Sequence, residues 1–337
     1  MEWSRSVERL ERVVRTCGPG PWTQAQLLAA GVTPAQMKRD VHAGRLTRLR
    51  RGVYAVPASR DIAAHRSDDR PALPTPGLLA GFGPVAAFSH ETASALNGTW
   101  LPKPADGLVH VSISGGVERS DRVFRVHGSR LAEADVAMLN GLRITSVPRT
   151  ALDLGRGLTF PEALVPMDSA YRQLVLGTDL TGRQLRRLPD DLPWLRARTD
   201  AARAQLEDAF TRVWSWPGTR VLRAALDNLE CRSESPYESW CRGWVIEAGA
   251  PTPRVGMRLL GASGREYFAD LVWESHRLIG EADGVAKLGT DPRLVAERLE
   301  AERVRQRDLE DAGWRFVRWN SGERPQRFTA RILSALA

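Results

Sequence analysis

Three carboxylates are grouped in the segment YFADLVWESHRLIGEADG, residues 267–284, which has the pattern of a two-stranded hairpin. If the chain turns at Ser275–His276 so that Trp273 faces Leu278, Asp270 lies opposite Glu281. Carboxylate oxygens are ligands that Mg²⁺ or Mn²⁺ prefers, and a bound ion can polarise a phosphoryl oxygen and activate a water molecule. The segment therefore predicts a divalent-cation site suited to phosphoryl chemistry.

The alternation of side chains along the hairpin makes this arrangement costly without a counter-charge. Asp270, Glu281 and Asp283 share one face with apolar Phe268, Val272 and Ile279, while the other face is apolar throughout. Opposed like charges destabilise a sheet, and burying them unpaired costs several kcal/mol each, roughly. A divalent cation removes both penalties. The alternative is a solvent-exposed face neutralised by arginines, and Arg318 is most simply an ion-pair partner of neighbouring acids.

The remaining C-terminal residues supply elements that would hold the hairpin. SESPYESWCRGWVIEAG predicts a helix that begins at Ser235–Pro236 and ends at Gly249. A charged helix over about 292–312 and a strand, WRFVRW, follow the hairpin. We therefore expect an α-β-β-α-β domain over residues 233–337.

The N-terminal residues 1–60 have the layout of a winged helix-turn-helix. A helix over 2–17 precedes two short helices capped by Thr23 and Thr33, and RLTRLRRGVYAV predicts a basic hairpin. Such a module binds double-stranded DNA, with basic side chains on the second helix and the wing contacting phosphates. A cationic solvated face and a module that docks a protein are the alternatives. The predicted nucleic-acid-binding residues are Lys38, Arg39, Arg45, Arg48, Arg50 and Arg51.

Two further segments complete a multidomain α/β chain. Residues 77–156, after a proline-rich stretch, predict a mixed α/β domain, and residues 157–232 a helical spacer. His90-Glu91 resembles half of an HExxH motif, but position 94 is Ser, so the motif is discarded. His110 and His127 lie in expected strands and are interpreted as packed or surface side chains rather than ligands.

Composition bounds the functional classes. The chain has 337 residues with 48 Lys+Arg against 40 Asp+Glu, a net charge of +8, which favours a polyanionic partner. No apolar run is long enough to span a membrane. Three scattered cysteines without CxxC spacing indicate a reducing cytoplasm and no structural zinc site.

Two resemblances extend these expectations. SPYES, FADLVW, LIGEADG and RDLEDAGWRFVRW resemble the nuclease-like domain related to very-short-patch-repair (Vsr) endonucleases, within the PD-(D/E)XK superfamily. GRLTRLRRGVYAV and TSVPRTALDL resemble proteins with an AbiEi-type antitoxin winged-helix domain. The first resemblance implies a restriction-endonuclease-like fold that cuts phosphodiester bonds, with Glu238 joining Asp270 and Glu281 around the metal.

The chain departs from the superfamily pattern at one position. The usual lysine lies two residues after the metal-binding Glu, where this chain has Asp283, so the resemblance leaves Lys287 to supply the positive charge. The leading hypothesis is a DNA endonuclease in which Asp283 assists the metal and Lys287 orients the nucleophile. Its rival is a non-catalytic DNA-binding regulator or antitoxin with a degenerate nuclease-like domain, and a toxin or other protein is the partner if the winged helix docks a protein.

Overall fold

The computed structural model of the chain describes residues 2–17, 22–50, 52–55, 79, 82–283 and 292–337. These residues form helices and three separate sheets, so the multidomain α/β class is confirmed. The chain divides into two compact units, residues 1–98 with 103–150 and residues 99–102 with 151–337, where the sequence suggested four segments. Among the described residues, no helix is both long enough and apolar enough to cross a bilayer.

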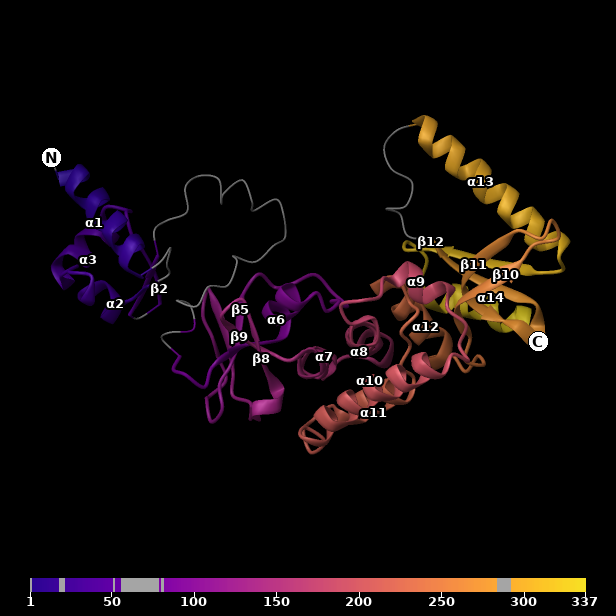
Figure 1. Cartoon of the computed structure of the whole chain (residues 1–337), viewed down its shortest axis with the longest axis horizontal. Coiled ribbons are helices and arrows are strands. Elements are labelled where there is room, and N and C mark those ends of the chain that lie inside the picture. Colours follow the sequence, from indigo (N-terminus) through magenta and orange to yellow (C-terminus); the bar gives the residue numbers. More distant parts are fainter. Residues whose placement is uncertain (1, 18–21, 51, 56–78, 80–81, 284–291) are drawn as a thin grey trace. The chain divides into compact units, whose positions relative to one another are not determined.

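The first unit begins with three helices and a small sheet of order β1-β3-β2, the layout expected for a winged helix (Figure 1). Thr23 and Thr33 each form a capping box with a glutamine three residues later, which explains where the second and third helices begin. Strand β1, Trp22–Thr23, was not predicted, because a strand of two residues has no periodic pattern in the sequence. The elements are α1 Glu2–Cys17, β1 Trp22–Thr23, α2 Gln24–Ala29, α3 Pro34–His42, β2 Thr47–Arg50 and β3 Val53–Ala55.

A six-stranded sheet of order β6-β7-β5-β4-β9-β8 forms the rest of the first unit. Its core contains Phe88, Val111, Phe124 and Ile144. A helix begins only at His90, because the preceding residues Ala87–Phe88 pair with two neighbouring strands. The elements are β4 Ala87–Phe88, α6 His90–Asn97, β5 Val109–Ser112, β6 Arg119–Ser120, β7 Phe124–His127, η2 Glu133–Asp135, β8 Val136–Leu139, β9 Leu142–Thr145 and α7 Val147–Gly155.

The second unit contains the helices expected over 157–232, and they pack directly on the C-terminal elements. Helix α8 lies along α12, and a Cβ at Gly243 of α12 would stand 2.5 Å from the Cα of Pro161, so only glycine allows this approach. The Arg242 guanidinium donates two 2.9 Å hydrogen bonds to the buried Asp168 carboxylate. The helices are α8 Phe160–Leu176, α9 Gly182–Arg187, α10 Pro193–Thr211, α11 Thr219–Asp227 and α12 Pro236–Glu247.

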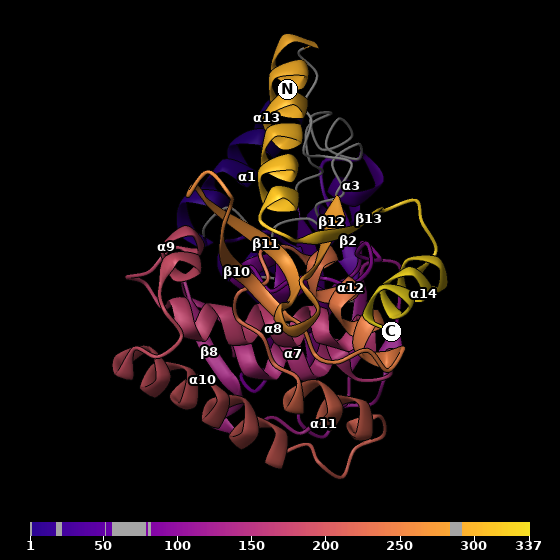
Figure 2. The ribbon, with the colours of Figure 1, turned by 90° about the vertical axis from the view of Figure 1, so that its right-hand side faces the viewer.

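The last sheet has the order β10-β11-β12-β13, antiparallel except for the parallel pair β12 and β13 that α13 connects (Figure 2). The expected α-β-β-α-β order is corrected by two additions, strand β10 before the hairpin and helix α14 at the end. The elements are β10 Arg254–Leu260, β11 Glu266–Trp273, η3 Glu274–His276, β12 Leu278–Asp283, α13 Pro292–Asp311, β13 Arg315–Asn320 and α14 Pro325–Leu336.

The predicted hairpin register is confirmed. Trp273 pairs with Leu278, and the turn is closed by Arg277 in the left-handed region, with φ of 48°. The apolar face, with Leu271 and Trp273, packs against α12 and α14 in one core, while Val272 and Ile279 pack with Leu309 of α13 in another. Both faces of the hairpin are therefore covered, and the carboxylates lie between layers.

We expect Arg242→Ala to destabilise the second unit by about 3–5 kcal/mol, because it leaves the Asp168 carboxylate buried without its counter-charge. Chemical denaturation followed by circular dichroism measures this loss. The control is Arg303→Ala, which removes an exposed pair with Glu300 at 3.7 Å and should cost less than about 0.5 kcal/mol. Equal effects of the two changes would contradict the role given to the buried pair.

Candidate functional site

The structure places Asp270 and Glu281 beside each other in the buried part of the hairpin. Asp270 is 9% exposed and Glu281 is 6% exposed, so neither carboxylate is a solvated surface group. The Asp270 Oδ2 accepts a 3.1 Å hydrogen bond from the Ala282 amide, which fixes Asp270 against the neighbouring strand. The sequence argument for partial burial of these two residues is therefore confirmed.

Arginines from α13 and β13 neutralise part of this cluster. Arg305 donates 2.7 Å hydrogen bonds to Glu281 Oε1 and to the Phe268 carbonyl, and it also pairs with Glu302 at 2.8 Å. Glu302 contacts Arg318 in turn, and the Arg318 Nη1 lies 4.0 Å from Asp283. The ion-pair role expected for Arg318 is confirmed. Arg305 was missed, because its partner lies 24 residues earlier in the chain.

Among the described residues, negative charge exceeds positive charge in this layer. They supply four carboxylates (Asp270, Glu281, Asp283 and Glu302) and two guanidiniums (Arg305 and Arg318), so their formal charge is about −2 when all ionise. Burial and the neighbouring Asp270 charge raise the pKa of Glu281 to about 7, although Arg305 and Arg318 act in the opposite direction. The electrostatics therefore favour one further positive species at Glu281.

Glu238 occupies the first turn of α12, where it serves as part of the helix start. Its Oε1 accepts a 2.9 Å hydrogen bond from the Ser235 hydroxyl and its Oε2 accepts a 2.8 Å bond from the Glu234 amide. The carboxylate oxygens of these three described residues, Glu238, Asp270 and Glu281, do not all lie within 4.8 Å of one another. The structure thus brings two of the three predicted ligands together and holds the third in a capping role.

The remaining predicted catalytic residues are placed differently. Asp283 ends β12 with its side chain 50% exposed, near Arg318. Lys287 lies outside the described residues. The donor set consists of hard carboxylate oxygens, which suits Mg²⁺ or Mn²⁺, but Arg305 already binds one oxygen of Glu281.

Cys241, on α12, does not contribute a thiolate to this region. Burial raises the pKa of its thiol to about 12, and Asp270 and Glu238 add to the increase. The Sγ accepts a 3.1 Å contact from the Trp319 indole N–H. A neutral, packed thiol is consistent with a site that uses oxygen ligands alone.

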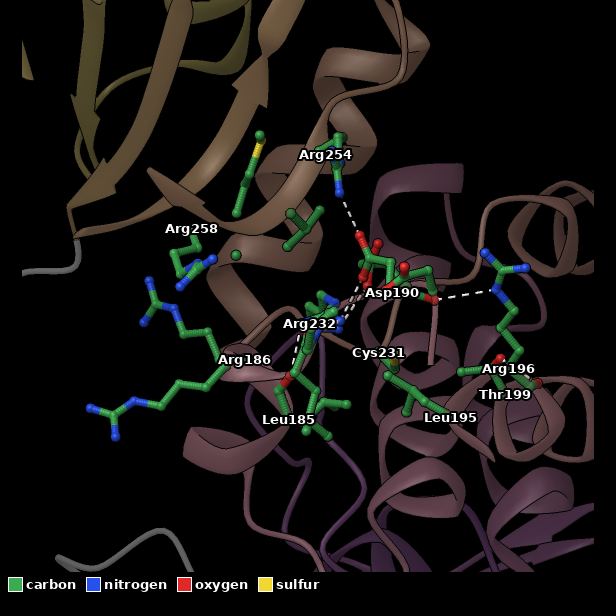
Figure 3. Close-up of a pocket in the computed structure, with 18 of the residues that line it drawn as sticks. Leu185, Arg186, Asp190, Leu195, Arg196, Thr199, Cys231, Arg232, Arg254 and Arg258 are labelled. Atoms are coloured by element: carbon green, nitrogen blue, oxygen red, sulfur yellow. Dashed lines mark hydrogen bonds and ion pairs between the residues drawn. The ribbon is translucent and has the colours of Figure 1, made fainter. Parts of the chain in front are cut away.

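A cavity of about 850 Å³ in the second unit is rich in arginine (Figure 3). Asp190 binds Arg232 and Arg254, each at 2.5 Å, whereas Arg186 and Arg258 lie on the other side of the cavity in Figure 3. Sequence reasoning missed this cavity, because its residues come from distant segments: α9 and the loop after it, α8 and α10, residues 229–232 before α12, and residues 252–258 at the start of β10. The arginines that line it are Arg186, Arg187, Arg196, Arg232, Arg254 and Arg258.

This basic cavity reaches the strand that carries Asp270. The Arg186 guanidinium stands 5.0 Å over the Phe268 ring, two residues before Asp270 in β11, and pairs with Glu234 at 2.7 Å. A second hollow, lined by Arg183, Arg186, Arg187, Glu234 and Phe268, extends the same surface. An arginine-rich surface and the strand that carries Asp270 are therefore neighbours within one unit.

The winged-helix residues divide into surface groups and one structural group. Lys38, Arg39 and Arg48 are exposed, and a hollow lined by Lys38 and Arg48 joins α3 to the wing. Arg45 instead donates a 2.8 Å bond to Asp40, which is fully buried. Burial raises the pKa of Asp40, but hydrogen bonds from Arg45 and Arg9 hold it below its usual value.

Arg50 and Arg51 are the last two basic residues predicted to bind nucleic acid. Arg50 belongs to β2, but its side chain is not described, and Arg51 lies outside the described residues.

Comparison with known proteins gives relatives but no family. No protein-family model matches the chain. Two proteins from two strains of Mycobacterium tuberculosis, the uncharacterized proteins MT2308 and Rv2248, are each 26% identical over 289 residues, which cover 85% of this chain and 89% of the relative. A crystal structure of the Rv2827c protein from Mycobacterium tuberculosis matches 76% of this chain and 88% of its own at 14% identity, with a TM-score of 0.32.

The raised pKa of Glu281 predicts that the free energy of unfolding depends on pH. Between its ordinary value of 4.5 and about 7 the unfolded chain releases this proton and the folded chain keeps it, so stability falls as pH rises. Relative to Glu281→Gln, the free energy of unfolding of the unaltered protein should fall by about 3 kcal/mol across this range, at 1.36 kcal/mol per pH unit. Urea denaturation at several pH values measures the difference, and a constant difference between pH 4 and 8, roughly, would contradict it.

Proposed function

We propose that this protein binds double-stranded DNA and that its second unit hydrolyses phosphodiester bonds with Mg²⁺ or Mn²⁺ bound at Asp270 and Glu281. The observation that carries the proposal is the buried pair of carboxylates, whose layer has a formal charge of about −2. A divalent cation supplies the missing charge. The resemblance to Vsr-related nucleases supports the same reaction.

Each residue of the proposed site has a distinct task. Asp270 and Glu281 would hold the ion, and Glu238 on the first turn of α12 would reach it through water, since both of its oxygens already accept hydrogen bonds. A bound Mg²⁺ would polarise the scissile phosphoryl group and lower the pKa of its water. Arg305 neutralises charge beside Glu281, at 2.7 Å. Asp283, at the end of β12, would assist the ion, and Lys287 would orient the nucleophile.

The basic surfaces support DNA as the substrate. Arg186, Arg187 and Arg258 would contact backbone phosphates next to β11, so that the duplex lies against the carboxylate pair. In the first unit, Lys38 and Arg39 on α3 and Arg48 on the wing would contact a duplex, and we propose the same contact for Arg50 and Arg51. The net charge of +8 favours both contacts.

A second candidate function is a DNA-binding regulator or antitoxin without catalysis. The observation that favours it is the 2.7 Å bond from Arg305 to Glu281, since a guanidinium there can replace a cation. Asp283 at the position of the superfamily lysine favours it as well. In this case a toxin or another protein is the second partner.

We further propose a cytoplasmic location. Cys17, Cys231 and Cys241 are all free, and two of them are buried. Unpaired, buried thiols are the state expected in a reducing compartment.

Cleavage assays on supercoiled plasmid and short duplexes, with Mg²⁺, Mn²⁺ or EDTA, test the catalytic proposal. Asp270→Asn and Glu281→Gln should each lower cleavage at least about 100-fold. Removing a residue that only hydrogen-bonds to a metal ligand typically lowers activity about 10- to 100-fold, and removing the ligand itself should lower it more. Isothermal titration with Mn²⁺ should show the matching loss of binding.

The matched control for this assay is Glu300→Gln, an exposed change on α13, which should cleave like the unaltered protein. Cleavage that survives both site changes would eliminate the site. Duplex binding without cleavage under either metal would favour the regulator.

Fluorescence anisotropy with labelled duplexes tests the winged-helix surface. Replacing Lys38, Arg39 and Arg48 together by Ala should weaken binding and lower the slope of log affinity against log salt by up to about 0.9 per lost phosphate contact. Arg119→Ala, an exposed change on β6, serves as the control. An unchanged affinity in the triple variant would indicate that this module docks a protein.

A further inference from the structure

Three histidines of the first unit, distant in sequence, come together at one end of its sheet. His90 is the first residue of α6, His110 lies in β5 and His127 ends β7. Strands β5 and β7 are parallel neighbours, and the Ser89 amide donates a 3.0 Å hydrogen bond to the His110 carbonyl, which ties the start of α6 to β5. The topology therefore fixes all three rings in one place.

The rings converge through their nitrogens. His110 Nδ1 lies 3.0 Å from His127 Nε2, and the rings of His90 and His127 stack with their centres 3.6 Å apart. One nitrogen from each ring lies within 4.8 Å of the others. Tetrahedral Zn²⁺ with Zn–N distances of about 2.0–2.1 Å separates its nitrogens by about 3.3 Å. Because an imidazole binds a metal in the plane of its ring, His90 would turn out of its stack on His127 to direct its nitrogen to the same ion.

Carboxylates stand behind two of the rings. The His110 Nε2, opposite the nitrogen that enters the cluster, lies 3.1 Å from Asp106 Oδ1. The His127 Nδ1 lies 3.9 Å from Oε1 of the exposed Glu118, which is beyond hydrogen-bond distance. Metal-binding histidines typically direct their other nitrogen to a carboxylate, which fixes the tautomer and makes the ring a better ligand.

The backbone at His90 provides an independent sign of a functional constraint. His90 has φ of 48°, in the left-handed region that a residue with a Cβ adopts at a cost of about 1 kcal/mol or more. This conformation starts α6 with the imidazole against His127. A packed histidine cluster alone does not explain why the chain accepts this cost.

We propose that His90, His110 and His127 bind a divalent transition-metal ion, of which Zn²⁺ is the representative, with Asp106 orienting His110. Neutral imidazoles suit Zn²⁺ and not Mg²⁺, and three protein nitrogens leave a fourth position for water. A second grouping, Glu91, Asp106 and His110, is less suitable, because Asp106 also binds Arg125 at 3.0 Å and its amide donates to Glu91. The proposal does not rest on the nuclease activity.

The test uses the full chain with Asp270→Asn, so that the carboxylate site does not take up the metal. After EDTA treatment and dialysis, titration calorimetry with ZnCl₂ should show one site, and Co²⁺ should give the visible absorption of a nitrogen-bound ion. His90→Gln and His127→Gln should each weaken Zn²⁺ binding at least about 10-fold, and Asp106→Asn about 10- to 100-fold.

The control is His276→Gln, a partly buried histidine in the second unit, which should leave Zn²⁺ affinity unchanged. Circular dichroism of each metal-free variant identifies those that fold. The proposal fails if the parent protein binds no Zn²⁺, or if folded His90→Gln and His127→Gln proteins bind it as tightly as the parent. His90 and His127 are both only partly buried, so both variants are expected to fold.

Discussion

The pairing of β11 with β12 is the constraint on which the C-terminal site depends. Because side chains alternate along a strand, the pair Trp273–Leu278 decides at once which residues enter each core and where Asp270 and Glu281 lie. A slip of one residue would move Trp273 out of its core, so the apolar packing holds the carboxylates in a costly position. The charged layer above β12 and β13 is the consequence, with arginines from α13 and β13 offsetting part of the repulsion.

Much of this architecture was predictable because its signals are local. Thr23 and Thr33 cap the helices they precede, Ser235–Pro236 starts α12, and the turn before Leu278 sets the hairpin register. The burial of Asp270 and Glu281 followed from the same alternation. Strand β10 escaped notice, because Gly256 interrupts its pattern with φ of 61°.

The partners of the site residues could not be predicted, since they are set by how distant segments pack. Arg305 reaches Glu281 across 24 residues, and Arg186 reaches Glu234 across 48. His110 and His127 were interpreted as packed or surface residues, and His90 only as half of a discarded motif, whereas the order of strands in the sheet groups all three. A sequence gives the residue types of such clusters, but only the topology gives their distances.

Arg305 and a divalent cation can each supply positive charge beside Glu281. The two candidate functions differ in which of them occupies that position. A guanidinium brings one positive charge and no exchangeable water, whereas Mg²⁺ brings two charges and open water positions. Because Arg305 also binds the Phe268 carbonyl and Glu302, it can release Glu281 and keep two of its partners. Catalysis requires that exchange at Glu281. A regulator requires no such exchange, since Arg305 of α13 can stay bound to Glu281.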